Sequence, residues 1–205
     1  MPRFDLTEAA IIAAFEQLLK KKPFSKISVK DITEFCGISR NTFYYHYQDK
    51  YDLMMKIFYS DVTRNVPEFD PSNHFSRTFM FLCKMMLERK SFYYPCLQYS
   101  GQNSLFSVLT EYLCELWDMN IRKMYYDAGV ILADYDTAFY ARMNAHALVG
   151  MIRDWVDSGM GDSILESLEK IDLLLDQTMK LFSREKDAYT GMSKLDTIAR
   201  EQARK

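Results

Sequence analysis

The stretch Ser28–Phe58, SVKDITEFCGISRNTFYYHYQDKYDLMMKIF, decides the fold. Ser28 is a good N-cap, and Asp31 follows at the third helical position, as in a capping box. A short helix follows, ends at Gly37, and carries the apolar positions Val29, Ile32, Phe35 and Cys36. Ser39 then caps a second short helix that runs to about His46. Two short helices joined by a tight glycine-containing turn predict a helix-turn-helix unit.

Five consecutive rings, Phe43 to Tyr47, occupy the second of these helices. An amphipathic helix buries only about half of its circumference, so some of the rings must face outward. Phe43 and Tyr47 are four residues apart and are expected to pack inward with Ile38 and Leu53. Tyr44, Tyr45 and His46 are then expected to face a partner outside the domain.

The composition predicts an all-α protein. Only seven glycines and five prolines occur in 205 residues, which argues against a strand-and-turn architecture. Residues 1–50 hold eight Lys and Arg against six Asp and Glu, whereas the remainder holds 18 against 22. The positive end therefore coincides with the ring-rich helix. Four widely spaced cysteines, the lack of a secretory leader and the lack of a long apolar run predict reduced thiols, no membrane span and a cytoplasmic location.

The pattern of apolar residues divides the chain into three parts. Residues 1–52 are expected to form the helix-turn-helix domain, 53–185 a helical regulatory and dimerisation domain, and 186–205 a polar tail. Helices are predicted at about 7–22, 75–90, 103–127, 135–157 and 162–183. Residues 91–102, SFYYPCLQYSGQ, are expected to separate two of these helices.

The short helix after Ser39 suits a recognition helix, which lies in the DNA major groove with its first residues at the base edges. Arg40 is shaped to read guanine and Asn41 to read adenine or contact the backbone. The side chains that offer donors to phosphate oxygens are Thr42, Tyr44, Tyr45 and His46, with Lys50 and, at the start of the preceding helix, Ser28 and Lys30. The alternative is a helical interaction module without DNA binding, in which the rings are structural.

The sequence FSKISVKDITEFCGISRNTFYYHYQDKYDLM, residues 24–54, resembles the N-terminal domain of the TetR family of bacterial transcriptional repressors. The resemblance rests on the residues Ser28, Gly37, Thr42, Phe43, Tyr44, Tyr45, His46, Tyr47 and Lys50. It implies base contacts from Lys30, Arg40 and Asn41, and phosphate contacts from Ser28, Thr42, Tyr44, Tyr45, His46 and Lys50. It further implies a homodimeric repressor on a palindromic operator. Asn41 stands where the family commonly has a small residue, so base preference does not carry over.

Two heptad-like seams occur after residue 135. The first consists of Ala138, Ala141, Ala145, Leu148, Ile152 and Trp155, and the second includes Ile164, Leu168, Ile171 and Leu175. Such spacing is typical of near-parallel helix packing. The interpretation is a two-fold dimer in which two helices per subunit form a four-helix bundle, and the alternative is a buried core within one chain.

Residues 75–127 are rich in rings and methionines, which suit either a ligand pocket or a packed core. In the resembling family this region encloses a small-molecule inducer. The candidate pocket residues are Tyr99, Trp117, Arg122, Tyr125, Arg142 and His146. The segments QNSLFSVLTEYL and ALVGMIRDWVDSGM also resemble the subgroup of this family that includes the activator of dihydroxyacetone kinase operons, which implies a protein co-regulator in place of an inducer.

The sequence contains none of the common catalytic motifs. The three histidines are far apart, and neither a Gly-rich phosphate loop nor a nucleophile elbow occurs. The cysteines lack the spacing of zinc ligands. No enzyme activity, catalytic residue, metal or cofactor is therefore expected.

Overall fold

The computed structural model describes residues 6–66, 75–127 and 134–161, together with 164, 166 and 170. These residues form eight α-helices and one short 3-10 helix, as the all-α prediction requires. The predicted helix at 162–183 lies almost entirely outside the described residues, and the polar tail 186–205 lies wholly outside them. None of the helices in the described part of the chain is long and apolar enough to cross a membrane.

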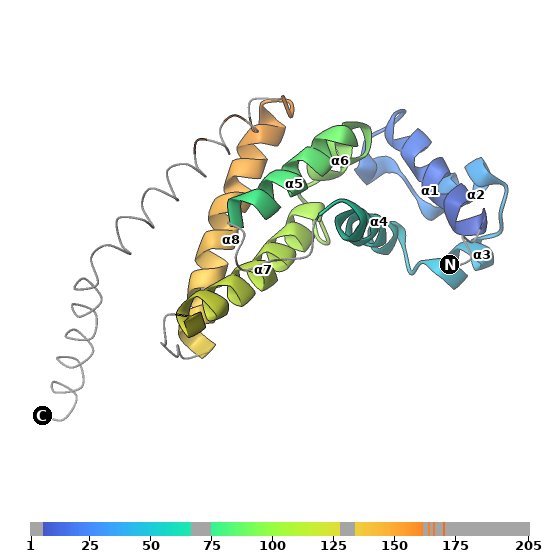
Figure 1. The fold of residues 1–205 in the computed structure, drawn as a ribbon. Coiled ribbons are helices and arrows are strands. Elements are labelled where there is room, and N and C mark those ends of the chain that lie inside the picture. The colour runs from blue at the N-terminus through green and yellow to red at the C-terminus, as the bar shows by residue number, and fades with distance from the viewer. Residues whose placement is uncertain are drawn as a thin grey trace, which may run out of the picture. The chain divides into compact units, whose positions relative to one another are not determined.

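The N-terminal helices form a small cluster, here called the head (Figure 1). It consists of α1 (Leu6–Leu19), the 3-10 turn η1 (Phe24–Lys26), α2 (Val29–Cys36) and α3 (Arg40–His46). α1 packs on α2, and α2 packs on α3. The fully buried side chains at the centre of this cluster are Ile11, Phe15, Phe24, Ile32 and Phe43.

The predicted signals for helix ends are confirmed in the head. Ser28 and Asp31 form a capping box at the start of α2, and Ser39 caps α3. Gly37 ends α2 with φ +70°, in the left-handed region that glycine enters without a steric penalty. The chain therefore turns between α2 and α3 at the residue that the sequence indicated.

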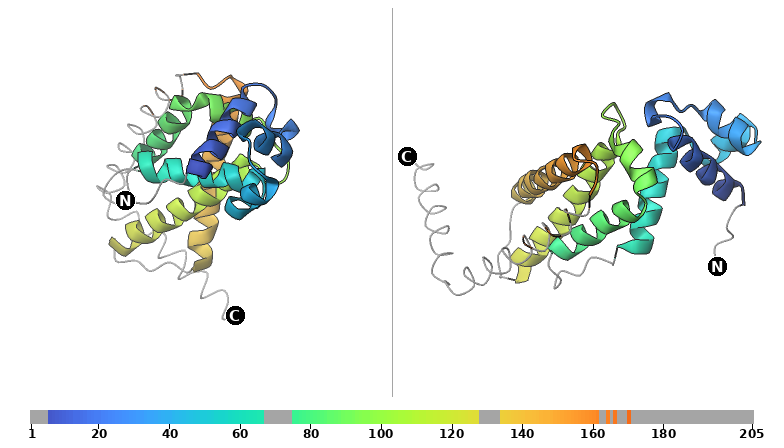
Figure 2. Two further views of the ribbon diagram at one scale, coloured as in Figure 1. Left: turned by 90° about the vertical axis from the view of Figure 1, so that its right-hand side faces the viewer. Right: turned by 90° about the horizontal axis from the view of Figure 1, so that it is seen from above.

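Helix α4 (Lys50–Asn65) leads out of the head. The Asp49 carboxylate caps it by accepting from the backbone N–H groups of Tyr51 and Asp52, at 2.7 and 2.8 Å. Its buried face carries Leu53, Met54, Ile57, Phe58 and Asp61. The turned views show α4 between the head and the remaining helices (Figure 2).

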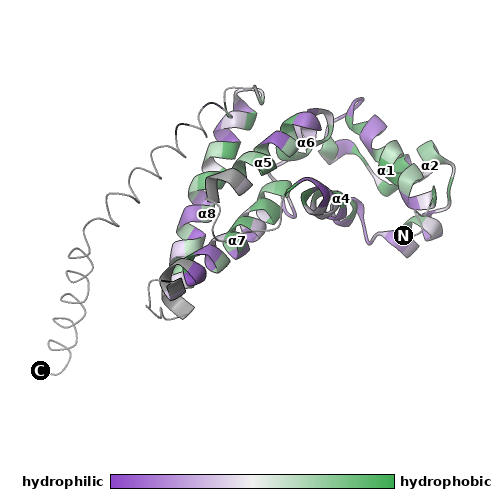
Figure 3. Ribbon diagram, viewed as in Figure 1, coloured by the Kyte–Doolittle hydropathy of each residue, from purple (hydrophilic) through white to green (hydrophobic). Residues whose placement is uncertain are grey.

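Four more helices follow: α5 (Phe75–Glu88), α6 (Lys90–Leu97), α7 (Leu105–Asp127) and α8 (Asp134–Asp157). Hydrophobic and hydrophilic residues alternate around them, as expected for helices that bury one face (Figure 3). Helix α6 was not predicted, because residues 91–102 were interpreted as a separator. It forms although Pro95 lies inside it, and it buries Phe92, Tyr93, Cys96 and Leu97.

Helices α7 and α8 pack along each other, and this contact corrects the predicted dimer seam. Ala141, Ala145, Ile152 and Trp155 of that seam are already buried within the chain. Leu148 is half-buried, Ala138 is exposed, and Ile164 of the second seam is buried. Leu168, Ile171 and Leu175 lie outside the described residues. The first seam is therefore mainly an intramolecular contact, which was the alternative interpretation.

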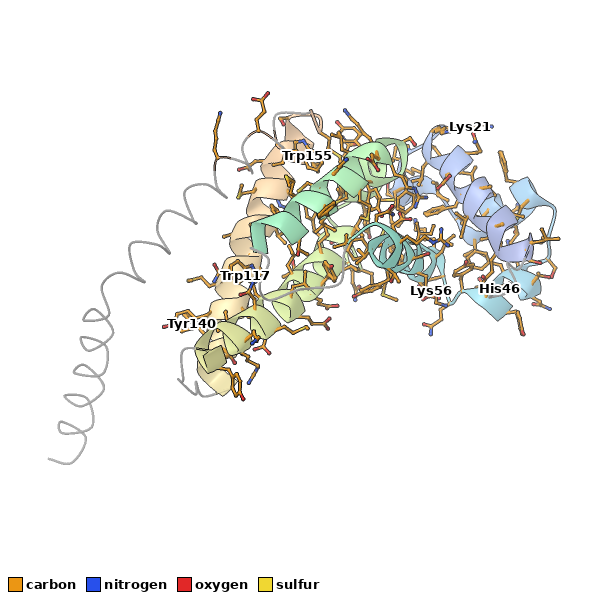
Figure 4. The ribbon with its side chains drawn as sticks, in the orientation of Figure 1. Lys21, His46, Lys56, Trp117, Tyr140 and Trp155 are labelled. Atoms are coloured by element: carbon orange, nitrogen blue, oxygen red, sulfur yellow. The ribbon has the colours of Figure 1, made fainter. Side chains whose placement is uncertain are left out.

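The opposite face of α8 is open and carries exposed apolar side chains beside the exposed Arg142 and His146. Phe139 and Met143 are 57% and 52% exposed, and Tyr140 is also exposed. Tyr140 projects from α8 on the side away from α7 (Figure 4). Further along the same face, no atom lies within 4 Å of the position that a Cβ on Gly150 would take.

Candidate DNA-binding interface

The start of α2 is held by a network of polar contacts. The backbone N–H of Ser28 donates to Asp31 Oδ2 at 2.7 Å, and the backbone N–H of Asp31 donates to Ser28 Oγ at 3.2 Å. Lys22 Nζ lies 2.8 Å from Asp31 Oδ1. The hydrogen bonds from Lys22 and Ser28 hold the pKa of Asp31 well below its usual range. Because Lys22 balances this carboxylate, the exposed Ser28 lies where an anion can approach the first N–H groups of α2.

Four of the five consecutive rings divide between the core and solvent as predicted. Phe43 is fully buried and Tyr47 almost so, whereas Tyr44 and Tyr45 are 54% and 85% exposed. Arg40 and Asn41 are exposed at the first turn of α3. Residues 40, 41, 44 and 45 share one side of a helix with 3.6 residues per turn. The structure therefore gathers two predicted base contacts and two predicted phosphate contacts on one open face of α3.

The two remaining predicted contact residues within α2 and α3, Lys30 and Thr42, differ in how exposed their side chains are. Lys30 is exposed, and its Nζ lies 3.6 Å from Glu34 Oε1, a separation at which the ammonium stays available. Thr42 is half-buried, and its hydroxyl oxygen lies 2.9 Å from that of the N-cap Ser39. The roles of Lys30 and Thr42 toward DNA stay predictions.

His46 is oriented differently from the prediction. Its side chain is only 8% exposed, and its Nδ1 lies 3.4 Å from Glu8 Oε1 of α1. Lys56 of α4 donates from Nζ to the carbonyl oxygen of His46 at 3.0 Å, so α4 holds the last turn of α3 (Figure 4). We therefore correct the interpretation of His46 as an outward-facing ring, because its imidazole is turned toward α1.

Lys50 also departs from the prediction of a surface phosphate contact. Its side chain is buried, and its ammonium donates to the carbonyl oxygens of Phe24, Ser25 and Ile27 at 2.9, 3.3 and 2.7 Å. Burial lowers the pKa of Lys50 from its ordinary value. A neutral amine has only two N–H bonds, so three acceptors favour the ammonium form. A contact with DNA would require Lys50 to leave these acceptors.

The structure describes five of the six predicted pocket side chains, and three of these five are exposed. Arg122, Arg142 and His146 are exposed, and Arg122 Nε donates to Asp118 Oδ2 at 2.6 Å. Trp117 is half-buried on α7, and the side chain of Tyr125 lies outside the described residues. Tyr99 belongs to the loop after α6, where its hydroxyl lies 3.2 Å from that of Tyr51. These positions do not support one pocket formed by the six side chains.

One polar cluster, centred on Arg89, was not predicted from the sequence. Arg89, at the start of α6, pairs with Glu16 of α1 and with Asp61 of α4. The Tyr93 hydroxyl of α6 donates to Asp61 Oδ2 at 2.6 Å. The available signal was Asp61 itself, since a carboxylate on the apolar face of α4 requires a buried partner. The cluster connects three helices at the junction of the head with α4 and α6.

Comparison with known proteins agrees with this geometry. Residues 11–57 match the family described as bacterial regulatory proteins, tetR family, and residues 73–177 match the family described as transcriptional regulator C-terminal region. The chain is 25% identical over 191 residues to the HTH-type dhaKLM operon transcriptional activator DhaS of Lactococcus lactis. This alignment covers 89% of the chain and 95% of DhaS.

Solved structures share the fold. The dihydroxyacetone kinase operon activator DhaS has a TM-score of 0.62 at 23% identity, with 86% of this chain and 97% of that chain covered. The Thermus thermophilus repressor FadR, solved in complex with lauroyl-CoA, has a TM-score of 0.54 at 20% identity. The coverage is 82% of this chain and 93% of FadR.

Proposed function

This chain belongs to the TetR family of bacterial regulatory proteins, and we propose that it acts as a homodimeric repressor on a palindromic operator and responds to a ligand. The observation that carries the proposal is the open face of α3, where Arg40, Asn41, Tyr44 and Tyr45 are exposed together. We propose that α3 enters the major groove and that Arg40 and Asn41 read bases there. Lys30 is the third proposed reader.

We propose that phosphate contacts come from Ser28, Thr42, Tyr44 and Tyr45. Ser28 places the first N–H groups of α2 at the phosphate, while its own hydroxyl donates to Asp31 Oδ2 at 2.7 Å, and the two tyrosines offer exposed hydroxyls. Residues 1–52 then form the DNA-binding domain, 53–185 the regulatory and dimerisation domain, and 186–205 a polar tail. The protein acts in the cytoplasm, where the operator is, and catalyses no reaction.

Dimerisation uses the exposed face of α8 in this proposal. Phe139 and Met143 present large apolar side chains there, and Gly150 leaves room for a partner helix to approach closely. Burying such side chains drives association, and two-fold symmetry pairs two heads for the two halves of a palindrome. The Met143→Glu variant should dissociate in sedimentation velocity. Ala138→Glu is a matched control in the first turns of α8, and an equal effect of both changes would remove Met143 from the interface.

The decisive experiment selects bound sequences from a random duplex library with the purified protein. A palindrome with half-sites about one helical turn apart is expected. The Tyr45→Ala variant is the matched control. It should fold normally, because an 85% exposed side chain contributes little to folding, and it should bind the selected DNA more weakly because it lacks the proposed phosphate contact. Absence of measurable binding at low salt would refute the proposal in favour of an interaction module without DNA binding.

A second proposal concerns what the protein responds to and whether it activates or represses transcription. The relative DhaS is an activator by its name, and three of the six candidate pocket residues, Arg122, Arg142 and His146, are exposed. Both observations favour a regulator that couples to a protein partner and activates transcription. If a small molecule releases the protein from the operator, the ligand-responsive repressor is supported. If the operator-bound protein instead recruits a second polypeptide, the activator is supported.

A further inference from the structure

Lys50 begins α4, yet its ammonium points back to the turn before α2. The three carbonyl oxygens that accept its hydrogen bonds belong to Phe24, Ser25 and Ile27. Phe24 and Ser25 belong to η1, and Ile27 immediately precedes the N-cap Ser28. One ammonium therefore gathers three carbonyl groups along the segment that leads into α2.

Aromatic rings complete the surroundings of Lys50. Its Nζ lies 4.6 Å from the ring centroid of Phe24 and 5.3 Å from that of Tyr51, within the range of cation–π attraction. The Phe24 ring also packs edge-on against Phe15 of α1 at 6.1 Å. The turn is consequently fixed between α1 and α4, with Lys50 as its charged centre.

The geometry points to a positioning role, and we propose that Lys50 holds the start of α2 in place for DNA without touching the DNA. The ammonium fixes η1 and Ile27, which fix the backbone of Ser28 and the first N–H groups of α2. The N–H groups of Val29 and Lys30, which lie outside the hydrogen bonds of the capping box, then meet the phosphate as neutral donors. The inference rests on the proposed function, and it assigns Lys50 a role different from the phosphate contact predicted from the sequence.

Salt dependence separates the two roles. A cation that contacts a phosphate adds about 0.9 to the slope of log K against log salt on duplex DNA. Neutral donors such as Ser28 release no counterion, so their loss weakens binding without changing that slope. Lys50→Met keeps the apolar stem but removes all three hydrogen bonds.

We expect Lys50→Met to lower affinity for the selected operator about tenfold, the size of losing hydrogen bonds from a charged donor, with an unchanged salt slope. Lys30→Met is the matched control, because it removes an exposed ammonium that displaces counterions when the head meets DNA, so its loss should flatten the slope by up to about 0.9. In a Ser28→Ala background, Lys50→Met should cost much less than tenfold, since both changes act at the same helix start.

Three results would overturn the inference. A slope that falls by about 0.9 in Lys50→Met would make Lys50 a phosphate contact. An equal loss with and without Ser28 would show that Lys50 does not act through the start of α2. Loss of the helical circular dichroism of the head would show that Lys50 supports the whole head. Failure of the unmodified protein to bind DNA would instead refute the proposed function.

Discussion

The Asp61→Asn variant tests the polar cluster that joins the head to α4 and α6. The Asp61 carboxylate is buried, accepts the Tyr93 hydroxyl at 2.6 Å and pairs with Arg89. An asparagine keeps the shape, and its one carbonyl oxygen can still take the place of Oδ2, which accepts from both Arg89 and Tyr93. The substitution removes the negative charge that pairs with the Arg89 guanidinium, so we expect the free energy of unfolding to fall.

The size of the loss in the free energy of unfolding depends on the contacts that Arg89 keeps in the variant. Removing one partner of a buried ion pair costs about 3–5 kcal/mol when the other charge is left without compensation. Arg89 keeps its contact with Glu16, and its side chain is 31% exposed, so water compensates part of the charge. We therefore expect a loss of about 2–3 kcal/mol, below the fully buried case.

Urea unfolding followed by circular dichroism measures this loss, at a fixed protein concentration because association adds to stability. With a slope of about 2–3 kcal/mol per molar urea, the midpoint should fall by about 1 M. Glu16→Gln is the matched control. Its side chain is 34% exposed, and its loss should cost less than about 1 kcal/mol.

A double-mutant cycle adds a second measurement to the same prediction. Tyr93→Phe removes the donor to Asp61, so its cost should shrink in the Asp61→Asn background if the two groups interact. An Asp61→Asn midpoint equal to that of the unmodified protein would refute the reasoning. It would mean that the charge of Asp61 beside Arg89 does not stabilise the junction.

Three further predictions concern the head. Arg40→Ala should cost about 1–3 kcal/mol on the selected operator and relax base preference in a competition assay, and equal losses on random DNA would argue against base reading. Gly37→Ala should lower the free energy of unfolding by about 1–2 kcal/mol, since φ is +70° and no atom within 4 Å obstructs the new Cβ. A thermal melt without any shift would contradict this backbone cost. Asp31 has a lowered pKa in the folded head, so its contribution is complete above its unfolded pKa of about 3.9 and is lost as the pH falls further. Asp31→Asn should therefore flatten the acid limb of stability against pH, and an unchanged limb would exclude Asp31 as its source.

The head was predictable from the sequence because its signals are local. The capping box of Ser28 and Asp31 spans four residues, and Gly37 determines the turn through its own φ. The division between Phe43 and Tyr45 follows from helical geometry alone. Signals of this kind depend little on the rest of the chain.

Side-chain direction over longer distances was not predictable. Lys50 reaches carbonyl groups 23 to 26 residues earlier in the chain, and nothing in its neighbourhood distinguishes a buried ammonium from a surface one. His46 turns toward Glu8, 38 positions away by residue number, for the same kind of reason. Helix α6 forms despite Pro95 because Phe92, Tyr93 and Leu97 gain more by burial than the missing N–H costs.

The seam on α8 shows what a sequence pattern leaves open. A heptad spacing indicates that a helix packs against a near-parallel neighbour, but it does not indicate whether that neighbour belongs to the same chain or to a partner. Ala141, Ala145 and Ile152 are buried within the chain, on a helix that packs along α7. The face with Phe139 and Met143 has the less regular pattern, yet it exposes more apolar surface. Since association is driven by the apolar area that remains open after folding, the face with the weaker pattern is the better candidate for the dimer interface.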